Sequence, residues 1–349
     1  MSNIFHDLLA EREYLVADGA TGTNLFAMGL QSGDAPELWN EEHPDRIRRL
    51  YDGFIEAGSD LFLTNTFGAN RYRLKLHNAQ DRVRELNMAA VRIGREAADA
   101  AGRPVIVAAS MGPTGEIFEP VGSLSLKDGE EAFAEQAEAQ AEAGADVHWI
   151  ETISGREELE AAIRGASRTG LPVVATMTFD TAGRTMMGLT PEDAGALGKG
   201  LSDELKAKGH VGVLAFGANC GVGPGTLIDS VQGIGRSTKD GGPLMVAKGN
   251  CGIPRYEDGE IVYSGTPEIM ADYARLARAA GAKIIGGCCG TTPVHVKAMV
   301  EALKDYTPDG DPSREAIEAA LGPIDMPKPT ADGGAGEARA ARRKRRRGE

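Results

Sequence analysis

The chain has 349 residues, of which 42% are hydrophobic, so it is long enough for two ordinary domains or for one of the larger α/β barrels. No apolar run approaches the roughly 20 residues that span a bilayer, and the first residues, MSNIFHDLLAEREYLVADGA, lack the pattern of a secretory signal. We therefore expect a cytoplasmic protein with no membrane partner. The formal net charge of −13 argues against nucleic acid as the partner of the folded part.

Eight short apolar runs, rich in β-branched residues, recur along the chain with a helix-like segment between each pair. They lie at residues 14–20, 60–67, 105–110, 146–152, 173–179, 211–220, 243–250 and 283–289. Runs that are apolar throughout, without alternation, are typical of parallel strands buried on both faces. Several of the segments between them show helical spacing and end in an Ala-Gly pair, and Gly is common at helix C-termini.

Eight such strand–helix units predict an α/β fold, a single (β/α)8 TIM barrel. A doubly wound open sheet is the alternative, although no Gly-x-Gly-x-x-Gly turn follows the first run. We expect the barrel over residues 1–305, a C-terminal helix and Pro-rich linker over 306–330, and a disordered basic tail over 331–349. The run 339–347 holds seven Lys or Arg residues and no acid, and it is either a solvated tail without a specific role or a contact for RNA, an acidic partner or the acidic body.

Polar residues stand at the ends of seven of the eight predicted strands. They are Asp18, Asn65, Thr66, Ser110, Glu151, Asn219, Cys220, Asn250, Cys251, Cys288 and Cys289. In a (β/α)8 barrel the C-terminal ends of the strands surround one mouth, and the active site lies there. Any one of these residues can be a simple loop former, but together they predict a site at this end of the barrel.

The four cysteines are the most informative of these residues. Cys288 and Cys289 are adjacent in the run IIGGCCGTTP, and neighbouring cysteines bridge only through a strained ring, so we do not expect a disulfide framework. Strand order brings Cys220 to the same rim, and three thiolates suit one Zn²⁺ ion with a fourth position left open, as at catalytic zinc sites. The alternative is that the cysteines are free and packed as small hydrophobic residues, and for Cys251 both interpretations stay open.

Three thiolates neutralise much of the Lewis acidity of zinc, so such a site suits a thiol substrate held as a thiolate better than it suits the activation of water. This chemistry indicates alkyl transfer to sulfur. The chain also contains, in order, DGATGTNL, GDAPELWNEEHPDRI, LTNTFGAN, SMGPTGE, WIETIS, GANCGVGP and IIGGCCGTTPVHV. Over residues 15–300 these motifs closely resemble the homocysteine S-methyltransferase family. This family includes betaine–homocysteine methyltransferases, S-methylmethionine-dependent enzymes and the homocysteine-binding module of cobalamin-dependent methionine synthase.

The resemblance implies a role for each matching residue. The zinc ligands, and hence the catalytic residues, would be Cys220, Cys288 and Cys289. The turn Asp18-Gly19-Ala20 matches the site for the amino-acid end of homocysteine, whose carboxylate would meet backbone N–H groups. Glu151 matches the acid that pairs with the substrate ammonium, and Ser110 would add a hydrogen bond.

The chain departs from the family pattern after the seventh predicted strand. Asn250 matches the Asn of an Asn-Ala-Gly turn, which can approach the metal when substrate is absent. Here the turn reads Asn250-Cys251-Gly252, so Asn250 and Cys251 are both candidate resting metal ligands. His148 and Trp149 precede Glu151, but alternation within a strand makes them as consistent with packing as with function.

The methyl donor is the least determined part of this interpretation. Betaine is a quaternary ammonium that is normally bound by a cage of aromatic faces, and betaine-using relatives carry an aromatic pair after the second strand. This chain has Trp39 but reads Phe67-Gly68 at that pair, and its NTFGAN form resembles the methionine synthase module. We expect methionine formation with methylcobalamin carried on a separate corrinoid protein. The alternatives are betaine or a sulfonium such as S-methylmethionine as donor, or a zinc-bearing binding module that does not catalyse.

Overall fold

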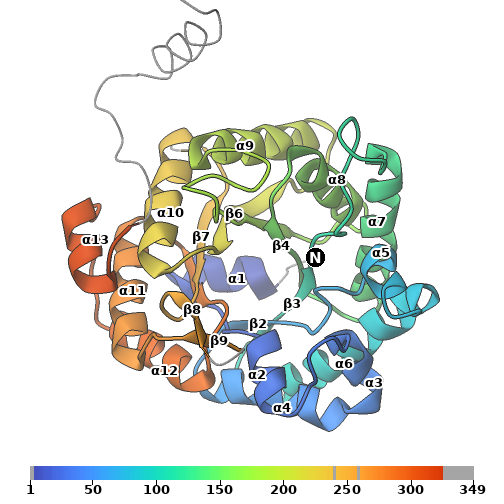
Figure 1. The fold of residues 1–349 in the computed structure, drawn as a ribbon, viewed down its shortest axis with the longest axis horizontal. Coiled ribbons are helices and arrows are strands. Elements are labelled where there is room, and N and C mark those ends of the chain that lie inside the picture. Colours follow the sequence, from blue (N-terminus) through green and yellow to red (C-terminus); the bar gives the residue numbers. More distant parts are fainter. Residues whose placement is uncertain (1–3, 239–240, 258–259, 325–349) are drawn as a thin grey trace, which may run out of the picture.

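The computed structural model describes residues 4–238, 241–257 and 260–324, and these form a ring of parallel strands surrounded by helices (Figure 1). The barrel strands are β1 (Leu15–Val16), β2 (Leu61–Leu63), β3 (Ile106–Met111), β4 (Val147–Ile153), β5 (Val173–Met177), β6 (Val213–Cys220), β7 (Leu244–Gly249) and β10 (Ile284–Gly287). Each overlaps one of the eight apolar runs, so the predicted strands are confirmed.

The helices that cover the outside of the barrel are α4 (Pro44–Glu56), α6 (Val83–Ala100), α7 (Leu126–Glu142), α8 (Arg156–Ser167), α9 (Pro191–Ala207), α10 (Pro224–Thr238), α11 (Pro267–Ala279) and α12 (Pro293–Leu303). The shorter elements are α1 (Ile4–Glu11), α2 (Gly22–Ala27), η1 (Pro36–Leu38), α3 (Trp39–Glu42), α5 (Arg71–Lys75), η2 (Gln80–Arg82), the hairpin β8 (Pro254–Glu257) and β9 (Glu260–Tyr263), and α13 (Arg314–Leu321).

The strand order is β1-β10-β7-β6-β5-β4-β3-β2, so each strand lies beside its neighbours in the sequence and the last strand pairs with the first. This order confirms the (β/α)8 barrel and excludes a doubly wound open sheet. The ladder is open only between β1 and β2, where two carboxylates complete the hydrogen bonding. Asp60 accepts from the Val16 N–H at 2.8 Å and Asp18 accepts from the Leu63 N–H at 2.7 Å.

Two layers of apolar side chains hold the barrel together. A large cluster joins the outer face of the strands to the surrounding helices, and a smaller one fills the interior with Leu61, Trp149 and Val246 among its members. Helix α1 closes one end of the barrel, because Phe5 and Leu8 belong to the interior cluster and the helix lies at the centre of the ring in Figure 1. The sequence did not lead us to expect this helix.

The chain after the barrel is described only as far as residue 324. Helix α13 lies within the predicted segment 306–330 and packs against α10 and α11 through the fully buried Ile317. The predicted basic tail, residues 331–349, lies outside the described residues, and the domain boundaries stay predictions. No helix in the described ranges has the length and apolar character needed to cross a membrane.

Candidate active site

Three cysteine sulfurs meet at the mouth of the barrel. Cys220 is the last residue of β6, and Cys288 and Cys289 directly follow β10. The Sγ atoms of Cys220 and Cys289 are 3.8 Å apart, and all three sulfurs lie within 4.8 Å of one another. A tetrahedral zinc ion with Zn–S bonds of about 2.3 Å requires sulfurs about 3.8 Å apart. The three predicted ligands therefore fit one zinc ion, and no other group of this kind occurs among the residues that the structure describes.

The backbone bends sharply at the cysteines. Cys220 has a φ of +62°, an unusual left-handed value for a residue with a side chain, and Gly221 follows at +74°. On the other loop, Gly290 has a φ of +78° and lies against Tyr263 of the hairpin, where a Cβ atom would be 2.4 Å from the Tyr263 ring. Glycine is therefore required beside the cysteine pair, as the Gly-rich sequence around it indicates.

Asn250 connects the two cysteine-bearing loops. Its Nδ2 donates to the Gly221 carbonyl at 2.7 Å, and its Oδ1 accepts from the Cys289 N–H at 3.1 Å. Its side chain thus holds the two loops at a fixed separation. The predicted role of Asn250 as a resting metal ligand stays a prediction.

Cys251 lies outside the sulfur cluster. Its side chain is 1% exposed and belongs to the hydrophobic layer between strands and helices, and burial raises the pKa of its thiol to about 11. Its N–H donates to the Cys289 carbonyl at 2.9 Å, so its backbone supports the metal loop. The structure brings together the three sulfurs predicted from the sequence and places the fourth among apolar side chains.

Hydrogen bonds among the three clustered thiols shift their pKa values in opposite directions. Hydrogen bonds from Cys220 and Cys288 lower the pKa of Cys289 to about 3, whereas its hydrogen bonds with the same two neighbours raise the pKa of Cys220. Tyr263 adds a further hydrogen bond to Cys289. A divalent cation favours the deprotonated form of all three cysteines, so its binding would displace the thiol protons that stabilise the Cys289 thiolate.

Glu151 and Ser110 lie on the floor of the cavity beside the sulfurs. Ser110 Oγ donates to Glu151 Oε1 at 2.5 Å, and both side chains are buried. Burial raises the pKa of Glu151 to about 7, and the nearby Cys288 adds to the shift. A buried carboxylate of this kind gains most from a cationic partner, which is the role that the sequence predicts for it.

A buried hydrogen-bonded network on the side of Ser110 away from the cavity fixes its backbone. Its carbonyl accepts from Thr66 Oγ1 at 2.7 Å and from Gln140 Nε2 at 3.0 Å. Gln140 Oε1 in turn bonds His148 Nδ1 at 3.1 Å, and His148 Nε2 bonds Thr169 Oγ1 at 2.9 Å. Burial lowers the pKa of His148 to about 3, so the ring is neutral. His148 is thus a structural residue of the β4–α7 contact and does not face the cavity.

The turn after β1 differs in detail from the predicted substrate turn. The Asp18 side chain is 2% exposed, and its carboxylate is bound to the ammonium of Lys248 in addition to the Leu63 N–H. The Ala20 N–H donates to the Thr291 carbonyl at 3.0 Å, and a Cβ atom at Gly19 would lie 2.5 Å from the same oxygen. Gly19 and Ala20 line the cavity, but the Ala20 N–H already has a partner.

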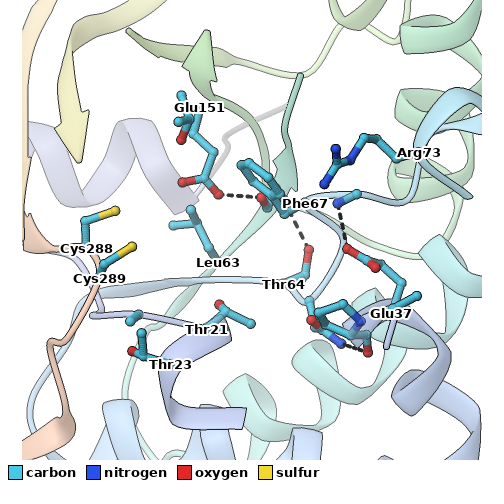
Figure 2. Close-up of a pocket in the computed structure, with 18 of the residues that line it drawn as sticks. Thr21, Thr23, Glu37, Leu63, Thr64, Phe67, Arg73, Glu151, Cys288 and Cys289 are labelled. Carbon is cyan, nitrogen blue, oxygen red and sulfur yellow. Dashed lines mark hydrogen bonds between the residues drawn. The ribbon is translucent and has the colours of Figure 1, made fainter. Parts of the chain in front are cut away.

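The cavity in front of these groups has a volume of about 390 Å³ and extends away from the sulfurs (Figure 2). Figure 2 shows Cys288, Cys289 and Glu151 on one side, with Glu37 and Arg73 beyond Phe67 on the other. Glu37 is buried and accepts from the Gly68 N–H at 2.6 Å. A Cβ atom at Gly68 would lie 2.8 Å from Glu37 Oε1. Neither Glu37 nor Lys248 was predicted as a site residue from the sequence.

Comparison with known proteins agrees with this geometry. The family model for homocysteine S-methyltransferase matches residues 15–303. The chain belongs to the homocysteine S-methyltransferase family. Methionine synthase of Mycobacterium tuberculosis is 32% identical over 313 residues, and that of Mycobacterium leprae is 30% identical. Each match covers 85% of this chain and 25% of the relative, so the chain spans about a quarter of the length of these relatives.

Solved structures of the family share the fold. The homocysteine methyltransferase MmuM from Escherichia coli in its metallated form is 26% identical, with a TM-score of 0.67, and the match covers 85% of this chain and 99% of that one. Its oxidized form matches with a TM-score of 0.68. Within the homocysteine S-methyltransferase family, this chain therefore matches nearly the whole of one solved methyltransferase chain and about a quarter of methionine synthase.

Proposed function

We propose that the protein is a zinc-dependent homocysteine S-methyltransferase that forms methionine with methylcobalamin carried on a separate corrinoid protein. The observation that carries the proposal is that three sulfurs, spaced for one zinc ion, and a buried carboxylate, Glu151, face one cavity. Such a pair of sites suits a ligand with a thiol at one end and an ammonium at the other.

Zinc bound by Cys220, Cys288 and Cys289 would lower the pKa of the substrate thiol and hold its sulfur as a nucleophile. Glu151 binds the ammonium, and Ser110 keeps that carboxylate in place. The substrate thiol loses its proton to solvent, its sulfur forms a bond to the methyl carbon, and the bond between methyl and donor breaks with its electron pair staying on the donor.

The neighbourhood of Phe67 argues against betaine as donor. Gly68 stands at the position after Phe67 where a betaine cage would have its second aromatic residue. The Glu37 carboxylate occupies the space in which a side chain at position 68 would begin. Trp39, the other aromatic residue considered from the sequence, is buried, with the Arg46 guanidinium 4.7 Å from its ring centre and the His43 ring packed against it at 78°. Trp39 already has a cationic partner and is not among the residues that line the cavity.

Exposed apolar side chains around the mouth support a donor carried by a macromolecule. Among the residues whose side-chain burial is described, which leaves out 254–261, ten large hydrophobic residues are exposed, and all but Val211 follow the C-terminal end of a barrel strand. They are Phe26, Leu76, Ile117, Val121, Met186, Met187, Ile253, Val262 and Val294. Apolar residues gathered at the end of the barrel that holds the cavity are typical of a surface that a partner covers.

A small cationic donor is the second candidate, because Phe26 and Phe67 line the cavity and Glu37 lies at its far end. The experiment that separates the candidates is incubation of zinc-loaded protein with homocysteine and methylcobalamin, betaine or S-methylmethionine in turn, with methionine measured. We expect turnover with methylcobalamin. Comparable turnover with betaine alone would refute methylcobalamin as the donor. The absence of methionine with every donor would favour a zinc-bearing binding module.

A further inference from the structure

A lysine is buried on the floor of the cavity. Lys248 lies two residues after Val246 on β7, so its side chain enters the barrel interior on the same face as the interior core. The side chain is 2% exposed, and its ammonium is bound to Asp18 and lies 5.8 Å from the centre of the Trp149 ring. Lys248 nevertheless lines the cavity together with Ser110 and Glu151.

The position of Lys248 concentrates opposite charges at one end of the cavity. Lys248 pairs in register with Asn219 of β6 and Gly286 of β10, which lie one and two positions before Cys220 and Cys288, and it lines the same cavity as Glu151. The other cavity-lining residues with basic side chains in the described chain, Arg73 and His77, lie at the opposite end near Glu37. An anionic group beside the sulfurs therefore has Lys248 as its cationic partner.

Three of the backbone N–H groups near the sulfurs already have acceptors within the protein. The N–H groups of Ala20, Gly287 and Cys288 donate to the carbonyls of Thr291, Asp18 and Gly249 respectively. An ammonium, in contrast, has three hydrogens. Lys248 uses one for Asp18 Oδ1, and its next contact, with the Asp18 carbonyl, is long at 3.5 Å. Donor capacity for a substrate anion thus remains at Lys248.

We propose that Lys248 Nζ binds the α-carboxylate of an amino-acid thiol while Glu151 binds its α-ammonium, and that Asp18 acts as a positioning residue that holds the lysine. This inference rests on the proposed function, because it assumes homocysteine as substrate. Opposite charges for the two ends of a zwitterion make the site specific for α-amino acids among thiols. Asp18 is itself fixed by the Leu63 N–H at 2.7 Å, so the lysine is anchored to the β1–β2 seam.

The test is calorimetric binding of three thiols to zinc-loaded protein: homocysteine, 3-aminopropane-1-thiol, which lacks the carboxylate, and 4-sulfanylbutanoate, which lacks the amine. For the wild type we expect homocysteine to bind about 10- to 100-fold more tightly than 3-aminopropane-1-thiol, the range of one charge-assisted hydrogen bond. In Lys248→Met this preference should fall below about threefold, while the affinity for 3-aminopropane-1-thiol stays within about twofold. Lys199→Met, on the outer helix α9, is the matched control and should behave as wild type.

A second variant covers the case in which Lys248→Met does not fold with Asp18 left unpaired. Asp18→Asn/Lys248→Met removes both charges together, and it should also lose the preference for the carboxylate. The inference is overturned if either variant, folded and zinc-loaded, keeps the wild-type preference, or if wild type binds homocysteine and 3-aminopropane-1-thiol equally well. Wild type that binds none of the three thiols would refute the proposed function and this inference with it. Binding of homocysteine with an unchanged preference in the variants would refute the role of Lys248 alone.

Discussion

Protonation of His148 should destabilise the fold below neutral pH. The ring is fully buried between Gln140 and Thr169, and burial lowers its pKa to about 3, from about 6.5 in an unfolded chain. Between these two values the unfolded state binds more protons than the folded state, so the free energy of unfolding falls as the pH falls. Each pH unit corresponds to about 1.4 kcal/mol, which gives a loss of about 2 kcal/mol between pH 7.5 and pH 5.

His148→Gln tests this reasoning because an amide cannot gain the proton. The assay is urea unfolding of wild type and variant at pH 7.5 and pH 5, with the free energy of unfolding compared for each protein. Buried carboxyls with raised pKa values, such as those of Asp18 and Glu158, contribute with the opposite sign, but they do so equally in both proteins. The variant should lose about 2 kcal/mol less than wild type on acidification. An equal loss in both proteins would refute a neutral, buried His148.

The remaining predictions concern the candidate site. Cys288→Ala should retain almost no zinc by metal analysis, because it leaves two sulfurs in the cluster, and full retention would remove it from the ligand set. Cys251→Ala should keep the wild-type zinc content, since its side chain lies in the apolar layer, and loss of the metal would make it a ligand. Glu151→Gln should weaken homocysteine binding by about 10- to 100-fold, the range for a charge-assisted hydrogen bond, with zinc content unchanged. An unchanged affinity would show that the ammonium lies elsewhere.

The strands and the sulfur cluster could be predicted because local pattern determines them. A continuous apolar run is needed wherever a strand is covered on both faces, so all eight barrel strands leave a signal in the sequence. The fold rule that strand ends share one mouth then places Cys220 beside Cys288 and Cys289 without any knowledge of contacts. Cys251 shows the limit of this rule, because a residue at a strand end can equally turn toward the outer core.

Pairings between distant residues could not be predicted in the same way. Asp18 and Lys248 are 230 positions apart, and a lysine in an apolar run signals an edge or an exposed position more readily than a buried ion pair. The contact between Glu37 and Gly68 likewise depends on the path of two loops. The hairpin β8–β9 did have a local signal in the run GNCGIPRYEDGEIVYSG, because Asp-Gly between two extended segments is typical of a hairpin. We did not predict the hairpin because it lies outside the eight repeated strand–helix units.

Helix α1 illustrates a third kind of omission. Its eight residues, IFHDLLAE, are too few for a clear helical period, and their apolar side chains have no partner until the barrel exists. Phe5 and Leu8 become core residues only because the interior of the barrel is open at that end. Elements that fill a space created by the rest of the fold are therefore visible only in the structure.

The most direct test of a zinc-bound homocysteine thiol is X-ray absorption at the zinc edge of the zinc-loaded protein, recorded before and after homocysteine is added. We expect three sulfur neighbours at about 2.3 Å without substrate and four with it, because the cysteine cluster leaves one tetrahedral position for the substrate sulfur. A sulfur count that stays the same after homocysteine is added at saturating concentration would contradict it.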